Sequence, residues 1–292
     1  MQKIAESELI LNPDKSIYHL KLHPHQIADT IIVVGDPGRV SLISSYFDKI
    51  EHQVSNREIV THTGVFNNKR LTVMSTGMGT DNIDIVLNEL DALVNIDLET
   101  RTIKKEKKSL NIVRIGTSGA MQKDIPVDSF VLSEYGLGLD GLLNYYDFKP
   151  SIYEKELVTK FYNQTEYLST FAEPYFVKGS INLYNLFKND CFTGITATAP
   201  GFYGPQGRVL RIPLKEKQLN EKLNLFKDGN LQVVNFEMET SALYGLSRIL
   251  GHNACTVCAV IANRFSNEFS KDYKSTVKKL IELVLYKLTQ PR

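Results

Sequence analysis

An apolar strand followed at once by glycine and small polar residues occurs three times in this sequence of 292 residues. Continuous apolar runs of this length are typical of strands that are buried on both faces of a parallel sheet. Because the carboxyl ends of parallel strands meet at one edge of a sheet, we expect the three glycine segments to surround a common crevice. The three segments are residues 30–38, 71–79 and 110–119. The pattern therefore predicts an α/β fold with a ligand site at that edge.

Two arginines accompany these glycine segments and favour an anion as the ligand. Glycine lets backbone N–H groups approach a ligand closely, and a helix that starts after such a turn directs free N–H groups at it. Arg39 lies in the short helix predicted after the first turn, and Arg114 precedes Gly116, where the third strand is expected to break. A buried guanidinium needs either a carboxylate or a bound anion, and both readings are open for Arg114.

Composition restricts the kinds of partner. The 34 Lys and Arg nearly balance the 33 Asp and Glu, so the net charge of +1 gives no field that would attract nucleic acid or an acidic membrane. The N-terminus lacks the apolar run of a signal peptide, and no segment is apolar over the roughly 20 residues of a membrane span. We expect a cytoplasmic protein. No Pro/Gly/Ser-rich linker divides the chain, so residues 1–292 should form one domain, with a weakly patterned N-terminal segment at 1–29 and a solvated charged loop at 99–108.

The cysteines and histidines form neither a disulfide pattern nor a metal pattern. Three cysteines suit a reducing compartment. Cys255 and Cys258 lie in an apolar run that predicts a strand, where side chains three apart point to opposite faces, so both should be core residues. The six histidines show no metal-ligand spacing, and we expect no metal ion.

The remaining periodicity predicts a hairpin and several helices around the sheet. The expected elements are a hairpin at 59–66 and 71–74 and helices at 151–171, 235–250 and 273–288. The hairpin would make the sheet mixed. Residues 136–141 match G-x-G-x-x-G, but no helix with a clean apolar stripe follows, so we expect no dinucleotide site there.

Two further segments carry side chains that suit a nucleoside. The loop at residues 201–208 contains Gln206 and Arg208. An amide donates and accepts at once and a guanidinium offers two parallel donors, a combination that fits a flat heterocycle. Glu239, in the opening residues of the helix predicted at 235–250, is suited to hold two adjacent hydroxyls of a sugar.

These residues resemble a known family. Four segments, in order and spacing, are similar to hallmark segments of the nucleoside phosphorylase family, and the match runs from about residue 18 to residue 264. The segments are Gly35-Asp-Pro-Gly-Arg39, Ser75-Thr-Gly-Met-Gly79, Arg114-Ile-Gly-Thr-Ser-Gly119 and Asn235-Phe-Glu-Met-Glu239. Residues 202–208 are similar to the uracil-recognition segment of uridine phosphorylases. The resemblance implies a single-domain α/β fold with a central mixed sheet flanked by helices.

The resemblance also implies a role for each matching residue. It assigns phosphate binding to Gly35, Arg39, Arg57, Arg114 and Thr117, ribose binding to His19, Met238 and Glu239, and base binding to Phe202, Gln206, Arg208, Ile261 and Arg264, with Arg114, Gln206 and Arg208 acting in catalysis. In the family, the residues matching His19 and Arg57 act in the neighbouring subunit's site. A homodimer with shared active sites is therefore expected, and its assembly into a trimer of dimers stays open.

The activity implied is reversible phosphorolysis of uridine to uracil and ribose 1-phosphate, with phosphate as co-substrate and no cofactor. Some relatives build a structural potassium site after the second glycine turn, but Asp81-Asn82 replaces the usual Pro-Ser there. Asn263 stands where purine enzymes place an aspartate, which agrees with a pyrimidine substrate. The alternatives are a purine or broad-specificity phosphorylase and a nucleoside-binding protein without turnover.

Overall fold

The computed structural model describes residues 3–290, so residues 1–2 and 291–292 of the predicted domain lie outside the described part. The strands are β1 (Thr30–Val34), β2 (Lys49–Asn56), β3 (Ile59–Phe66), β4 (Lys69–Ser75), β5 (Ile96–Asp97), β6 (Thr102–Ile103), β7 (Asn111–Ala120), β8 (Phe130–Gly138), β9 (Tyr175–Lys178), β10 (Phe192–Thr198), β11 (Lys227–Asp228), β12 (Leu231–Glu237), β13 (Asn253–Asn263) and β14 (Glu268–Phe269). The α-helices are α1 (Gly38–Ser44), α2 (Thr80–Asn95), α3 (Ile152–Thr165), α4 (Ile181–Phe187), α5 (Leu219–Leu225), α6 (Thr240–Leu250) and α7 (Tyr273–Thr289).

One mixed sheet of twelve strands organises the molecule, as the sequence predicted. Its main path runs β11-β12-β10-β8-β13-β7-β1-β4-β3-β2, with β9 beside β8 and β14 beside β13. The central strands β1, β4, β7 and β13 pair in parallel, whereas β2, β3 and β4 pair antiparallel. Because β12 also pairs with β7, five strands close on themselves at one end of the sheet. The result is a single α/β domain.

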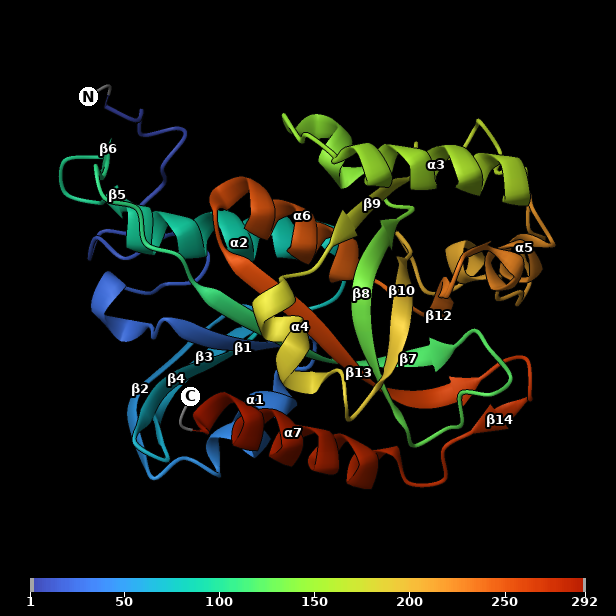
Figure 1. The fold of residues 1–292 in the computed structure, drawn as a ribbon. Helices are drawn as coiled ribbons and strands as arrows, with labels where there is room; N and C mark the ends of the chain where they lie inside the picture. Colours follow the sequence, from blue (N-terminus) through green and yellow to red (C-terminus); the bar gives the residue numbers. More distant parts are fainter. Residues whose placement is uncertain (1–2, 291–292) are drawn as a thin grey trace.

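Helices cover both faces of this sheet. In Figure 1, α2, α6 and α3 lie on one side, and α1, α4 and α7 lie on the other. Alternate residues of β1 serve the two sides, since Ile31 and Val33 pack with the α2 and α6 cluster while Ile32 and Val34 pack with α1, α4 and α7. This explains why β1 is apolar at every position.

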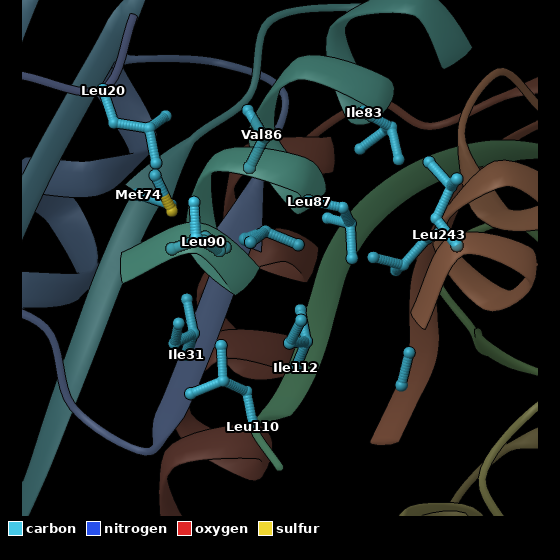
Figure 2. Packing of buried hydrophobic residues seen from close by; sticks show 14 of the residues in the cluster. Leu20, Ile31, Met74, Ile83, Val86, Leu87, Leu90, Leu110, Ile112 and Leu243 are labelled. Carbon is cyan, nitrogen blue, oxygen red and sulfur yellow. The ribbon is translucent and has the colours of Figure 1, made fainter. Parts of the chain in front are cut away.

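The helix α2 shows how the sequence periodicity becomes packing. Its buried residues include Ile83, Val86, Leu87 and Leu90, at the spacing of one helix face. In Figure 2 these side chains extend toward the strands that carry Ile31 and Ile112 and toward Leu243 of α6. Full burial of such a side chain contributes about 1.5–3 kcal/mol. The stripe therefore fixes the helix that follows the second glycine turn.

The third glycine segment differs from the prediction, because the strand does not break at Gly116. Strand β7 continues to Ala120, with Gly116 paired to Cys258 of β13 and Gly119 paired to both β13 and β12. A Cβ on Gly116 would lie 2.1 Å from Nη1 of Arg114. This glycine thus leaves room for a neighbouring side chain within a strand and does not form a turn.

Other boundaries also differ locally. Residues 235–237 complete β12, and α6 begins only at Thr240, because the Glu237 carboxylate accepts hydrogen bonds from the backbone N–H of Glu239 and Thr240. The helix α3 ends at Thr165, where Glu166 adopts a left-handed φ of 48°. The charged segment 99–108 contains β6, which forms a two-stranded sheet with β5. Among residues 3–290, none of the helices combines the length and the apolarity of a membrane span.

Candidate active site

The glycine segments surround one cavity of about 570 Å³, as the sequence predicted. It lies at the carboxyl ends of β1, β4, β7, β12 and β13, since residues at or just after the end of each strand line it. Ten of the predicted site residues contribute to the lining: Gly35, Arg39, Arg114, Thr117, Phe202, Gln206, Arg208, Met238, Glu239 and Ile261. Side chains from widely separated segments thus converge on one volume.

Arg114 forms an ion pair, which was one of its two predicted readings. Its side chain is 6% exposed, Nη1 lies 3.1 Å from the Glu237 carboxylate, and Nη2 donates to the Glu239 carboxylate. Burial by itself would lower the pKa of Arg114, but Glu239 and Glu237 outweigh it and raise the pKa above its usual value. The guanidinium is therefore a fixed cation. Its Nε–H is buried without a hydrogen-bond partner among the described residues.

Arg39 is the second cation of the cavity. It lies in the first turn of α1, and Nη1 donates to the Ile115 carbonyl at 3.3 Å. Burial lowers its pKa, and the positive charge of Arg114 adds to the effect, while Asp36 acts in the opposite direction. Within residues 3–290 Arg39 forms no salt bridge, so an anion bound in the cavity would relieve the repulsion between the two arginines.

Glu239 connects two of the glycine segments. Glu239 forms an ion pair with Arg114 of β7. Its Oε1 also accepts a hydrogen bond of 2.8 Å from the backbone N–H of Gly79, which lies in the turn that follows β4. Glu237 has a separate structural role, because it also accepts from the Thr198 hydroxyl at 2.7 Å. Burial raises the pKa of Glu237, although Arg114 acts against this. The sequence pattern pointed to Glu239 alone and gave no sign that Glu237 helps to hold Arg114.

The loop at residues 201–208 presents an amide and a guanidinium as one unit. Arg208 Nη1 donates to Gln206 Oε1 at 2.7 Å, and the guanidinium carbon lies 3.6 Å from the Phe202 ring centroid. Burial and the charge of Arg264 lower the pKa of Arg208 to about 10. Because Arg208 occupies the Gln206 carbonyl oxygen, the Gln206 amide nitrogen is the group left to donate.

Arg264 and Asn263 do not line the cavity. Arg264 Nη1 donates to the backbone carbonyl of Gln206, so it supports the loop from behind. Asn263 is 1% exposed, donates to the carbonyls of Gln122 and Ile125, and accepts from two backbone N–H groups. Asn263 thus ties loops together, and its identity says nothing direct about the ligand.

His19 and Arg57 also lie outside this chain's cavity. His19 Nδ1 is 2.6 Å from Glu89 of α2, and the guanidinium of Arg57 lies 5.6 Å from the Tyr18 ring centroid. The side chain of Asn56 donates to the His19 carbonyl, so the two segments adjoin on the surface. The structure brings these two residues near each other, but away from the other predicted site residues of their own chain.

Three more side chains in or near the cavity had no predicted role in the site: Asp36, Glu58 and Cys258. Asp36 and Glu58 line the cavity close to Arg39 and Gly77. Cys258 is a free, fully buried thiol whose Sγ accepts a hydrogen bond from Arg114 at 3.5 Å, and burial raises its pKa. Within the described residues, no group of three His, Cys, Asp or Glu is placed to hold a metal ion.

Comparisons with known proteins extend this picture. The family model described as "Phosphorylase superfamily" matches residues 29–288. The uridine phosphorylase of Thermococcus kodakarensis is 29% identical over 277 residues, which cover 93% of this chain and 86% of that protein. A DeoD-type purine nucleoside phosphorylase of Bacillus cereus is 26% identical over 275 residues, 91% of this chain and 96% of that protein.

A solved structure agrees with the same assignment. A Trypanosoma brucei nucleoside phosphorylase, described as showing uridine phosphorylase activity, superposes with a TM-score of 0.88 at 32% identity. The superposition covers 96% of this chain and 99% of that chain. The family match spans most of the chain, and its segments form the cavity. The chain therefore belongs to the phosphorylase superfamily.

Proposed function

We propose that this protein is a uridine phosphorylase, a pentosyltransferase that converts uridine and phosphate reversibly into uracil and ribose 1-phosphate. The observation that carries the proposal is that one cavity holds two arginines, a sugar-binding carboxylate and the Gln206–Arg208 pair. Two of the similar proteins named above are described by uridine phosphorylase function or activity. The three groups match the three parts of the reaction: phosphate, ribose and base.

Phosphate would bind between the two cations. Arg39 and Arg114 supply charge, while the backbone of Gly35 and the hydroxyl of Thr117 add hydrogen-bond donors. Attack on the anomeric carbon needs no protein nucleophile, because phosphate itself forms the new bond as the base leaves. Catalysis then rests on holding phosphate in line and on stabilising the charge that develops.

Ribose and base would occupy the rest of the cavity. Glu239 would accept hydrogen bonds from the ribose hydroxyls, with Met238 packed against the sugar. Uracil leaves as an anion, so donors on Gln206 and Arg208 bind it more strongly in the transition state than in uridine. Phe202 and Ile261 would pack on the base, and Arg264 would act through the Gln206 carbonyl that it holds.

A purine or broad-specificity phosphorylase is the second candidate, because DeoD-type purine enzymes also match most of the chain. The two are separated by rates with uridine and inosine at saturating phosphate. We expect a higher kcat/KM for uridine. Cleavage of inosine but not of uridine would place the protein with the purine enzymes, and tight uridine binding without any product would make it a nucleoside-binding protein.

We further propose a homodimer in which His19 and Arg57 complete the partner's site. Both residues lie outside their own chain's cavity, and they adjoin each other, as a segment donated to a second copy would. The test mixes the inactive variants Arg57→Ala and Arg114→Ala and allows their subunits to exchange. A mixed dimer has one intact site, so random pairing should restore about a quarter of the activity. No recovery despite proven exchange would refute the shared site.

The remaining expectations concern setting and cofactors. We propose a cytoplasmic enzyme, because its three cysteines are free thiols, the state that a reducing compartment maintains. Nucleoside and phosphate suffice as substrates for the mechanism above, so no cofactor is proposed. Assembly beyond the dimer, to a trimer of dimers, is testable by light scattering of the purified protein.

A further inference from the structure

A second cavity, of about 350 Å³, lies behind the loop that carries Gln206. Pro200, Gly204 and Pro205 line the second cavity, whereas Phe202, Gln206 and Arg208 line the first. The segment 200–208 is therefore a shared wall with one group of residues facing each cavity. A volume of this size falls within the range of small-molecule sites, roughly 300–1,000 Å³.

Most of the second cavity is apolar, but three charged side chains also line it: Asp140, Lys215 and Glu216. Asp140, which follows β8, accepts hydrogen bonds from the Leu142 N–H and the Ser241 hydroxyl, both at 2.8 Å, and from the Tyr175 hydroxyl at 2.9 Å. All three donors are neutral. The Tyr175 hydroxyl lies 2.9 Å from both carboxylate oxygens, so each oxygen accepts two hydrogen-bond contacts, and none of the donors supplies a positive charge.

Asp140 is partly buried and lacks a cationic partner within residues 3–290, an arrangement that leaves its charge only partly compensated. No salt bridge to Asp140 occurs within residues 3–290, and burial raises the pKa of its carboxyl despite the three hydrogen bonds. Lys215 also lines the cavity, but it is exposed and forms no salt bridge with Asp140. Glu216, at the same side, is neutralised by Lys222 at 2.9 Å.

The other lining residues suit an apolar body. They include Leu139, Phe171, Pro213, Leu214 and Leu219. Apolar walls around one unpaired carboxylate fit a ligand that combines a ring or short hydrocarbon with a single ammonium group, because burying the pair together offsets the cost of the isolated charge. We propose that this cavity is a second binding site, for a small apolar amine held by Asp140.

Two connections would couple this site to the first cavity. The shared wall is one, since a ligand against Pro205 restricts the loop that positions Gln206. The other is a chain of hydrogen bonds from Asp140 to the Ser241 hydroxyl, and from the Ser241 N–H through Thr198 to Glu237, which holds Arg114. An amine bound to Asp140 would therefore influence both Gln206, which is assigned to the base, and Arg114, which is assigned to phosphate.

The test uses benzylamine as the probe and titration calorimetry at pH 8, with benzyl alcohol as the uncharged counterpart. We expect saturable binding of one benzylamine per chain and at least about tenfold weaker binding of benzyl alcohol. Asp140→Asn, which keeps the shape of the side chain, should weaken benzylamine by at least about tenfold, a difference of about 1.4 kcal/mol. Lys215→Met should not weaken benzylamine binding, because the Lys215 ammonium would only compete with the amine for the Asp140 carboxylate.

A second variant guards against a folding defect in Asp140→Asn. Ala172 lines the cavity and is not one of the hydrogen-bond donors to Asp140, so Ala172→Leu should fill the space and abolish binding while leaving those hydrogen bonds in place. Absence of saturable binding to the wild type, or equal binding by Asp140→Asn, would overturn the site. These binding results do not depend on the proposed reaction.

The coupling between the two cavities is measured through the KM for uridine, a test that rests on the proposed function. Saturating benzylamine should change the KM for uridine in the wild type and leave it unchanged in Ala172→Leu. A uridine KM that ignores bound benzylamine would contradict the coupling. Inability of the enzyme to cleave uridine at all would instead count against the proposed function and leave the calorimetric result intact.

Discussion

Arg114 of β7 and Glu239, which lies 125 positions later at the start of α6, are hydrogen-bonded to each other inside one cavity. The pair joins the cation expected to bind phosphate to the carboxylate expected to bind ribose. Both side chains are buried, and the Glu239 carboxylate raises the pKa of the Arg114 guanidinium and so keeps it charged. Because attack by phosphate must occur at a carbon of that ribose, a fixed link between the two groups holds both substrates in register.

Glu239→Gln should reduce kcat/KM for uridine by about 10- to 150-fold, since a hydrogen bond to a charged group is worth about 1.5–3 kcal/mol. The KM for phosphate should change less, because Glu237 still holds Arg114. Steady-state kinetics with each substrate varied in turn measure both effects. Glu237→Gln is the matched control and should act mainly on phosphate. A larger effect of Glu239→Gln on phosphate than on uridine would reverse the two roles.

Gly116→Ala should displace the Arg114 guanidinium, because the new Cβ would lie 2.1 Å from Nη1 and 2.8 Å from the Cys258 sulfur. A misplacement of about 1 Å can cost about 100-fold in rate, and we expect a loss of that order in kcat/KM for phosphate. Gly119→Ala, in the same strand, is the control, since its Cβ meets nothing closer than 3.9 Å. Equal losses in the two variants would show that the position of the guanidinium is not what matters.

The position of Arg114 illustrates how far the sequence can predict this molecule. Apolar runs and helical spacing predicted β1, β7 and α7, because burial on one or both faces leaves a direct trace in the residue order. Whether Gly116 makes a turn or leaves room for a side chain depends on what packs against it from β13, far along the chain. That information is absent from the local sequence.

The same limit applies to the site. Ten of its predicted residues line the cavity, because the strand ends that carry most of them could be recognised. Asn263 was read as standing where purine enzymes place an aspartate, but its amide holds two loops together. A polar side chain at the end of a buried strand fits either role, and only the direction of the side chain decides between them.

Gln206→Ala should lower the preference for uridine over inosine by about tenfold or more, because the base loses a donor and Arg208 loses the acceptor that orients it. The ratio of kcat/KM values for the two nucleosides measures this. Asn220→Ala, which removes only a 3.3 Å hydrogen bond to the Gln206 backbone carbonyl, should have a smaller effect. An unchanged ratio in Gln206→Ala would remove this residue from base recognition.

Arg248→Met should destabilise the fold by an amount near the lower end of about 3–5 kcal/mol, because Glu154 is buried while Arg248 is partly exposed. Two hydrogen bonds of 2.7 and 2.9 Å join the pair. Urea unfolding measures the loss. The double variant Glu154→Gln with Arg248→Met should regain part of the stability, since no unpaired charge remains, and failure to regain any would attribute the loss to packing.

The same pair predicts a pH dependence. Burial alone would raise the pKa of Glu154, but Arg248 and two backbone N–H groups lower it below the usual 4.5. A carboxyl with a lowered pKa in the folded state adds stability above its unfolded pKa and loses it as pH falls through the folded value. The difference between wild type and Arg248→Met should therefore be full above about pH 5 and shrink at lower pH. A difference that stays constant down to pH 3 would contradict this.

The most direct measurement is the dependence of uracil release on phosphate, followed by absorbance for uracil and by ³¹P NMR for the sugar product. We expect no release from uridine in phosphate-free buffer, and one ribose 1-phosphate formed for each uracil once phosphate is added. Release of uracil at the same rate without phosphate, with free ribose as the product, would contradict the assignment of Arg39 and Arg114 to a phosphate nucleophile.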